Sequence, residues 1–263
     1  MDLTAPVGMG IFLLAVIGGR ILEGGNPLFL FQYTAAWIVF GGTIGAMVYG
    51  ARSMDILNFP KHVKMTFVKS NVHPQDILPQ IVRFAEKARR EGLLSLEREV
   101  QNVEDDFMKQ GLQLVADGTD PEIVKAIMGM RLDQVEVRHE RVTKMYEAGA
   151  GYAPTVGIIG AVLGLIGVME HLSEGIDKVG PGIAVAFVAT IYGLVAANLI
   201  LFPMASKLKL NHQAEMHLRE MMLEGILSIQ AGDNPRIIEE RLKAFLSNEE
   251  RLAYEENRET QKG

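Results

Sequence analysis

Four long stretches without any charged residue or histidine constrain this sequence more than any other feature. They cover residues 3–19, 28–51, 148–169 and 179–206. A helix needs about 20 apolar residues to cross a bilayer core, within a range of about 17–25, so each stretch is long enough. Buried helices of a large soluble protein are the alternative, but four such runs in 263 residues favour membrane spans. The sequence therefore predicts an all-α, polytopic membrane protein.

The distribution of positive charge predicts how the chain crosses the membrane. We assign the transmembrane helices to residues 3–22, 28–51, 148–170 and 179–206, a cytoplasmic helical domain to 52–147 and a cytoplasmic helical C-terminal region to 207–263. Residues 52–147 hold 15 of the 26 Lys and Arg residues, and the chain from residue 207 onward holds 9. Because positive charge is retained in the cytoplasm, we expect a multi-pass protein of the inner (cytoplasmic) membrane with both termini cytoplasmic.

The polar regions show helical periodicity and helix caps. Apolar residues recur every three or four positions over 77–88, Asp120 and Pro121 begin a helix over 121–130, and a further helix over 132–150 continues into the third span. Another helix is expected over 207–230, and Asn234 caps a short helix that starts at Pro235. Their apolar faces are attributed to packing within a helical domain rather than to ligand binding. The last dozen or so residues are expected to fray.

The spans contain small and weakly polar residues in place of charges. Gly157, Gly160, Gly164 and Gly167 follow the spacing that lets membrane helices approach closely. Thr190 and Asn198 need hydrogen-bond partners in lipid, and these could be the backbone, another helix or water in a pore. Pro154 and Pro203 lie near the cytoplasmic ends of the third and fourth spans. Each could act as a hinge or could simply mark the end of a helix. With no acid in any of the four uncharged stretches, an ion conducted through mid-membrane needs a carboxylate from another chain.

Several function classes are excluded by composition. The net charge of −6 and the mixed signs of the polar regions argue against nucleic-acid binding. Cysteine is absent, the six histidines are scattered, and the sequence has no P-loop, metalloprotease or serine-hydrolase motif. We therefore expect no metal site, no cofactor and no enzymatic activity.

Five segments resemble a known family. They are 88–97 (ARREGLLSLE), 111–118, the Ala153-Pro154 pair with the glycine-rich third span, Tyr192-Gly193, and 229–236 (IQAGDNPR). In order and spacing they resemble the flagellar motor stator proteins of the MotA and PomA kind, over essentially the whole chain. That family belongs to the MotA/TolQ/ExbB proton channel superfamily.

The resemblance implies partners and site residues. Proteins of this family form a five-membered ring around a dimer of a single-span subunit, which is anchored to peptidoglycan and supplies the membrane aspartate. Their cytoplasmic loop acts on a rotor switch-complex protein. Carried over by motif, the rotor-facing charges are Arg89, Arg90 and Glu97, with Arg236 as a further candidate; without the resemblance they would be an ordinary solvated surface. Candidate ion-pathway residues are Pro154, Ile158, Ala161, Thr190, Tyr192 and Asn198.

The resemblance also bears on the choice of ion. Sodium-driven relatives have a threonine where this chain has Ala161, paired threonines where it has Ala189 and Thr190, and an acidic residue where it has Gly151. Sodium requires oxygen ligands, whereas a proton requires only a carboxylate and a water path. The sequence therefore favours H+ as the transported ion, with Na+ as the alternative.

Three other functions remain open at this point. The chain could be an energy-transducing subunit resembling TolQ or ExbB, although those proteins have three spans and this chain has two leading spans joined by residues 23–27. It could also be the permease component of an ATP-driven transporter, or a structural membrane scaffold.

Overall fold

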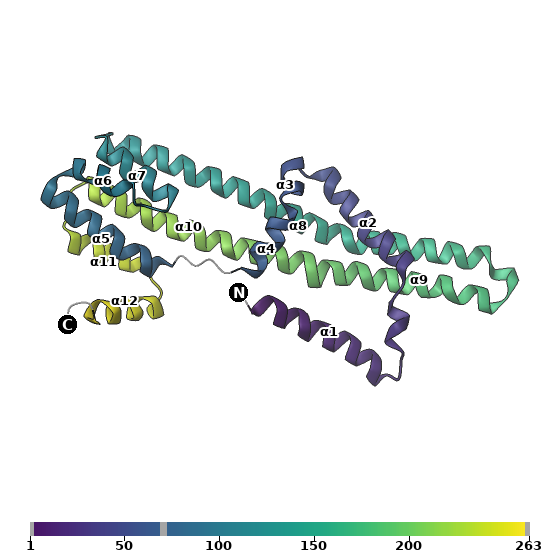
Figure 1. Cartoon of the computed structure of the whole chain (residues 1–263). Coiled ribbons are helices and arrows are strands. Elements are labelled where there is room, and N and C mark those ends of the chain that lie inside the picture. The colour runs from purple at the N-terminus through teal and green to yellow at the C-terminus, as the bar shows by residue number, and fades with distance from the viewer. Residues whose placement is uncertain (1–2, 69–72, 261–263) are drawn as a thin grey trace. The chain divides into compact units, whose positions relative to one another are not determined.

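The fold is helical throughout the described chain (Figure 1). The computed structural model describes residues 3–68 and 73–260, and every regular element in these ranges is a helix. The chain divides into two compact units: residues 1–69 with 139–210 form unit 1, and residues 70–138 with 211–263 form unit 2. The predicted all-α class is confirmed.

Unit 1 contains the apolar helices. Its elements are α1 (Thr4–Leu22), η1 (Pro27–Leu30), α2 (Tyr33–Gly50), α3 (Ser53–Leu57), α4 (Phe59–Phe67), the second part of α8 (Pro121–Glu170), η3 (Leu172–Glu174), α9 (Ile176–Val195), η4 (Ala196–Leu201) and the start of α10 (Phe202–Gln230). Four helical stretches are long and apolar enough to cross a membrane: Thr4–Leu22, Pro27–Gly50, one within Pro121–Glu170 and one within Val179–Gln230.

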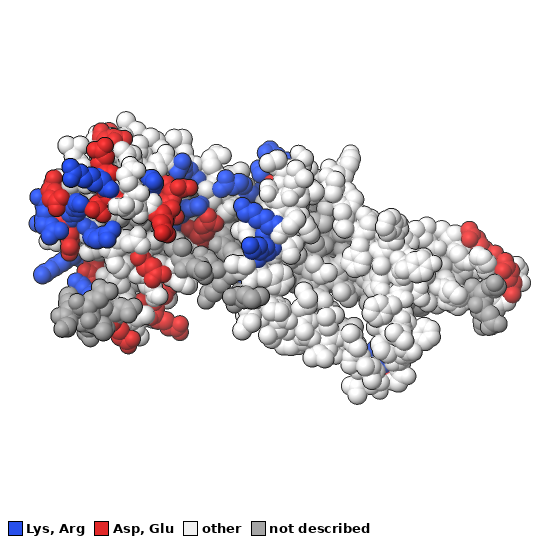
Figure 2. Space-filling model, in the orientation of Figure 1, with Lys and Arg blue, Asp and Glu red and all other residues white. Residues whose placement is uncertain are grey.

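The apolar surface of these helices is largely uncovered. No residue of α1 is buried, and side chains such as Leu14 and Leu22 are 75% and 90% exposed. Charged side chains gather over unit 2 in Figure 2, whereas white surface predominates over α1 and α9. A water-soluble chain rarely exposes apolar surface on this scale, so the four helices fit a hydrocarbon surrounding.

The backbones of α8 and α9 are in direct contact, and they lie side by side in Figure 1. A methyl group added at Gly157 would lie 3.0 Å from the carbonyl oxygen of Ala189, and one at Gly193 would lie 2.6 Å from that of Ala153. One added at Gly164 would lie 2.8 Å from the carbonyl oxygen of Gly182. Only glycine permits such an approach. We call this contact the glycine seam.

The third helix of this group packs on the same seam. Ala35 and Val39 of α2 are fully buried with Val188 and Ala189 of α9. Gly160 continues the contact, because a methyl group there would lie 2.8 Å from the Ala189 Cβ atom. The predicted packing role of the glycines is confirmed for the first three of the third span, whereas Gly167 has no atom within 4 Å of such a methyl group.

One predicted helix boundary is wrong. Residues 121–130 and 132–150 were expected to form separate helices, but α8 runs without interruption from Pro121 to Glu170. Arg131 and Leu132 both favour a helix. Because the Leu132 side chain is also buried in the core of unit 2, the helix continues through these two residues. The cap is as predicted, since Asp120 accepts a hydrogen bond from the Glu122 backbone at 2.9 Å.

Unit 2 is built around one hydrophobic core. Its elements are α5 (Pro74–Glu91), η2 (Leu93–Ser95), α6 (Leu96–Val100), α7 (Asp106–Ala116), α11 (Pro235–Leu242), η5 (Lys243–Phe245), α12 (Asn248–Thr260) and the remaining parts of α8 and α10. The predicted apolar face of α5 is buried against α10 and α11, with Leu78, Ile226 and Ile238 fully buried. Asn234 caps α11 by accepting from the Arg236 backbone at 3.1 Å.

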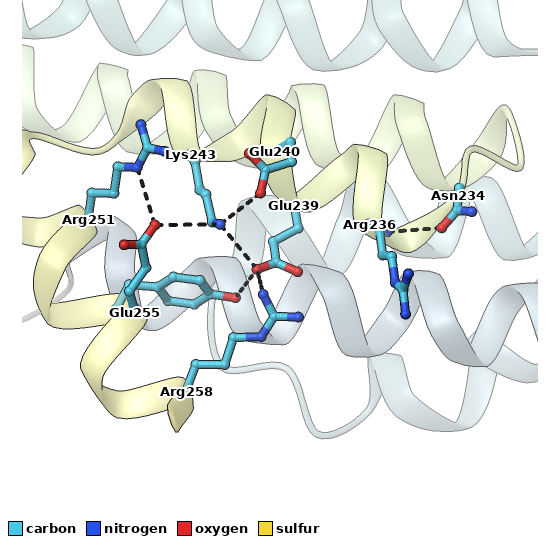
Figure 3. Close-up of polar contacts among 9 residues, drawn as sticks. Asn234, Arg236, Glu239, Glu240, Lys243, Arg251, Glu255 and Arg258 are labelled. Carbon is cyan, nitrogen blue, oxygen red and sulfur yellow. Dashed lines mark hydrogen bonds and ion pairs between the residues drawn. The ribbon is translucent and has the colours of Figure 1, made fainter. Parts of the chain in front are cut away.

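The expectation of a frayed C-terminus is wrong for residues 252–260, which belong to α12 (Asn248–Thr260); residues 261–263 lie outside the described residues. Figure 3 shows the reason: the carboxylate of Glu239, 3% exposed, accepts from the Tyr254 hydroxyl at 3.3 Å and from Arg258. Lys243 joins them, 3.6 Å from Glu239 and 2.8 Å from Glu240. Burial, together with the nearby Glu239, raises the pKa of Tyr254 to about 12. Ion pairs and one aromatic ring thus hold a helix that lacks a broad apolar face.

The glycine seam yields a test with a matched control. We expect Gly193→Ala to destabilise unit 1 by about 1–3 kcal/mol, the usual cost of overpacking, because the new methyl group meets backbone atoms that cannot move aside. Gly167→Ala should be neutral or slightly stabilising, since nothing lies within 4 Å. Thermal unfolding of both variants in detergent measures the difference, and equal unfolding temperatures would contradict the seam.

Candidate functional site

The polar residues of the candidate ion pathway bond to their own helix. The Thr190 hydroxyl donates to the Ala186 carbonyl at 3.2 Å, and the Asn198 amide donates to the Leu194 carbonyl at 2.9 Å. Of the partners that the sequence left open, the structure shows the backbone for both side chains. Such bonds satisfy a polar group in lipid. Their place in an ion pathway stays a prediction.

The α8 candidates differ in exposure. Ile158 is 58% exposed, whereas Pro154 and Ala161 are half-buried. Ile158 therefore presents its side chain to whatever surrounds unit 1. Gly157 and Gly160, which precede and follow Ile158 in the sequence, face the seam. The pathway candidates of α8 therefore lie next to residues that contact α9.

Tyr192 has a structural role that the sequence analysis missed. Its hydroxyl donates to the Leu30 carbonyl at 2.6 Å and accepts from the Gln32 backbone at 3.2 Å. Its ring lies 5.9 Å from that of Phe40 in α2. The tyrosine thus fastens the turn before α2 to α9. The only signal in the sequence was a lone phenol in an apolar span, which needs a partner for its hydroxyl.

A π-helical segment precedes Pro203. η4 spans Ala196–Leu201, and Pro203 follows in the first turn of α10. Proline has no N–H to donate, and its ring crowds the carbonyl four residues earlier, so the regular helical bonding pattern cannot continue there. π-helical turns are rare and are often found at functional sites. The structure locates a local distortion in the fourth span, and the hinge roles of Pro154 and Pro203 stay predictions.

The four candidate rotor-facing charges are all exposed side chains of unit 2. Arg89 and Arg90 lie in the last turn of α5, Glu97 in α6 and Arg236 at the start of α11. In the described part of the chain, none of the four forms a salt bridge. Figure 3 shows Arg236 apart from the Glu239 network, bonded to Asn234 through its backbone. Charges left unpaired in this way are available to a partner.

Neighbouring charges on the same surface are paired. Lys87 lies 2.7 Å and Arg83 3.7 Å from carboxylate oxygens of Glu99. The hydrogen bond from Lys87 lowers the pKa of Glu99. The charges carried over by motif differ in this respect from Arg83, Lys87 and Glu99. In the described part of the chain they share the lack of an ion pair with Glu86, Glu91 and Arg98.

A buried polar cluster in unit 1 was not anticipated. Arg141 in α8 binds the 7% exposed Asp55 of α3 with two bonds, of 2.8 and 3.2 Å. Beside this pair, His62 of α4 meets the ring of Tyr146 edge-on at 6.0 Å. The His62 Nδ1 atom and the Tyr146 hydroxyl are both buried without a hydrogen-bond partner. Burial lowers the pKa of His62 from 6.5; the Asp55 carboxylate opposes this shift and Lys61 adds to it.

No metal centre accompanies these groups. Within residues 3–68 and 73–260, no three His, Asp or Glu side chains gather as a metal site would require.

Comparison with known proteins identifies the family. Residues 99–221 match the model of the MotA/TolQ/ExbB proton channel family, and residues 6–92 match that of the motility protein A N-terminal region. Motility protein A of Bacillus subtilis is 34% identical over 264 aligned positions, covering 100% of this chain and 97% of the relative. The chain belongs to the MotA/TolQ/ExbB proton channel family.

Within this family the chain is similar to the motility proteins over its full length. Motility protein A of Treponema phagedenis is 38% identical, covering 97% of this chain and 98% of the relative. The solved structure of the flagellar MotAB stator complex from Bacillus subtilis superimposes with a TM-score of 0.88 at 34% identity, covering 96% of this chain and 99% of that one. The family resemblance that the sequence motifs indicated is confirmed, and so is a multi-pass membrane protein.

The His62 cluster generates a pH-dependent prediction. Because the pKa of His62 is lowered in the folded protein, a state with α4 displaced binds the proton more tightly than the docked state. Docking of α4 is therefore most stable above about pH 6.5 and weakens as the pH falls below that value. Hydrogen–deuterium exchange of residues 59–67 in detergent, corrected for intrinsic rates, should show less protection at about pH 5.5 than at about pH 7.5.

The matching variant is His62→Gln, which keeps a polar side chain but does not titrate. It should show little difference between the two pH values. An equally large loss of protection in this variant would assign the effect to another group.

Proposed function

We propose that this chain is the ion-conducting stator subunit of the bacterial flagellar motor. One observation carries the proposal: the chain matches a flagellar MotAB stator chain in sequence and fold from end to end, including the N-terminal region specific to motility proteins. Its activity is ion conduction coupled to torque, with no enzymatic step and no cofactor.

The proposed partner is a single-span subunit that supplies the ion-binding aspartate. The four spans of this chain contain no acid over residues 3–19, 28–51, 148–169 and 179–206. A group that takes up a proton or sodium ion in mid-membrane must then come from another chain. By family resemblance, that chain is anchored to peptidoglycan and sits as a dimer inside a pentamer of copies of this one.

The residues of this chain would act as a rigid wall around that carboxylate. The glycine seam keeps α8 and α9 in fixed contact, and Tyr192 ties α9 to the turn before α2. Thr190 donates its hydroxyl hydrogen and Asn198 donates one amide hydrogen to their own helix, and both keep oxygen atoms that can still accept a hydrogen bond from water. The proposed ion pathway follows this face of α9 and η4 beside Ile158 and Ala161.

The proposed orientation places both termini and unit 2 in the cytoplasm of the cell, with the spans in the inner membrane. It is supported by the Lys and Arg residues, 24 of 26 of which fall within residues 52–147 or after residue 206. In this orientation Arg89, Arg90, Glu97 and Arg236 face the rotor switch-complex protein. Mixed exposed charges favour fast and reversible contacts over tight binding.

The transported ion is proposed to be the proton, with sodium as the alternative. Ala161 and Ala189 offer no side-chain oxygen, which leaves the Thr190 hydroxyl as the one side-chain oxygen at these three positions. Sodium needs several oxygen ligands to replace its hydration shell, whereas a proton moves along water to a carboxylate.

The rotor-facing role is tested by reversing charge. We expect Arg89→Glu combined with Arg90→Glu to lose most of its rotation speed at high load, because each reversal replaces an attraction of roughly 1 kcal/mol or less with repulsion. The measurement is tethered-cell rotation in a strain that lacks its own stator subunit and carries this gene with its partner gene. Lys125→Glu, an exposed charge on α8, is the matched control and should rotate normally.

Two further observations complete that experiment. Membrane levels of the double variant should equal those of the unaltered chain, and omission of the partner gene should abolish rotation. Normal torque in the double variant would show that these arginines do not contact the rotor. Absence of rotation with the unaltered chain would contradict the stator function itself.

The ion is tested by removing sodium. Swimming speed should persist when sodium is replaced by potassium at constant pH, and should fall when a protonophore collapses the proton gradient, because alanine at positions 161 and 189 supplies no oxygen ligand for sodium. A sharp loss of speed on sodium replacement alone would reassign the chain to sodium transport.

A further inference from the structure

Two sequence motifs that lie far apart in the chain form opposite walls of one cavity in unit 2. The cavity has a volume of about 200 Å³. Ala85, Ala88 and Arg89 of α5 line one side, and Ile229, Ala231 and Asp233 line the other. We call this cavity the socket. The motifs over 88–97 and 229–236, two of the five segments that carry the family resemblance, thus meet at a single surface feature.

The socket has an apolar floor. Ala85, Ala88 and Ile229 are 3%, 8% and 2% exposed and belong to the hydrophobic core of unit 2. Gly92, which ends α5 with a φ of +83°, and Gly232, which follows α10 with a φ of +73°, also line it. Glycine at both helix ends allows the chain to turn away and leaves the floor open.

The rim of the socket carries one cation without an ion pair and one anion that is already paired. The Asp233 Oδ2 atom lies 3.2 Å from Nη1 of Arg241, an arginine that also lies 3.2 Å from Glu224. Arg89 forms no salt bridge in the described part of the chain, and the neighbouring Arg90 forms none. A partner that fits must offer an apolar group for the floor and a carboxylate for the rim.

Other occupants fit less well. Small-molecule sites in proteins usually measure about 300–1,000 Å³, so the socket is small for a metabolite and suits a single side chain. A free inorganic anion would offer no apolar group to the floor formed by Ala85, Ala88 and Ile229.

We propose that the socket receives one apolar side chain of the rotor protein, with a carboxylate beside it that pairs with Arg89. This inference rests on the proposed stator function and adds to it a mechanical anchor. Exposed charges steer and orient a partner, whereas a few side chains buried in pockets supply most of the binding free energy at an interface. Leu94, 75% exposed and next to the lining residue Leu93, extends the apolar surface beside the socket.

The chain contains no cysteine, so the socket can be filled after the protein has folded and assembled. In the full-length chain, Ala231→Cys introduces a thiol at an exposed lining position, and Ala126→Cys introduces one at an exposed alanine of α8 as the matched control. A benzyl methanethiosulfonate reagent then attaches an apolar ring to the thiol through a disulfide bond. Tethered cells are recorded before and after treatment, and again after the disulfide is reduced.

Rotation speed at high load should fall severalfold in the Ala231→Cys strain, recover on reduction, and remain unchanged in the Ala126→Cys strain. Ion flux through the assembled stator should be the same before and after treatment, because the spans are not altered. Full torque with the Ala231→Cys thiol completely modified, as shown by mass spectrometry, would overturn the socket and leave the stator function standing. Failure of the unmodified chain to restore rotation would instead overturn the proposed function, and the socket with it.

Discussion

The contact between the backbones of α8 and α9 is the constraint on which the rest of unit 1 depends. Inside a bilayer, apolar side chains gain nothing by leaving lipid for protein, so helices associate through close packing and backbone approach. Gly157, Gly164 and Gly193 provide that approach. Because α8 and α9 are in fixed contact, Ala35 and Val39 of α2 can pack against α9. The Tyr192 hydroxyl of α9 can then bond to the turn that leads into α2.

The chain separates its apolar and charged chemistry between the two units. Unit 1 contains four apolar stretches that present bare hydrocarbon surface, and unit 2 contains a soluble helical core with exposed charges. This separation explains how a chain with 48% hydrophobic residues also accommodates 22% charged residues. It also separates the proposed tasks. Unit 1, with its uncharged membrane stretches, is suited to guiding an ion, and unit 2, with its unpaired exposed charges, is suited to contacting a soluble partner.

Local features were predictable from the sequence, whereas long-range pairings were not. The four spans, the apolar face of α5 and the caps at Asp120 and Asn234 follow from composition and spacing over a few residues. The Arg141–Asp55 pair joins residues 86 positions apart, and the Tyr192–Leu30 bond joins residues 162 apart, so no local pattern announces either. The two wrong predictions, a helix break after residue 130 and a frayed C-terminus, have this same cause. Leu132 of α8 packs in the core of unit 2, and α12 is held by contacts with the buried carboxylate of Glu239.

The buried carboxylate of Glu239 makes the C-terminal helix part of the charge balance of unit 2. Its donors Tyr254 and Arg258 come from α12, and Lys243 comes from η5. Substitutions that remove the Tyr254 hydroxyl and the Arg258 guanidinium but keep α12 in place would leave an almost fully enclosed anion with Lys243 as its one nearby cation, and a poorly paired buried charge is costly to a fold. The side chains at positions 254 and 258 are therefore constrained from the interior of unit 2, although they lie close to the C-terminal end of the described chain.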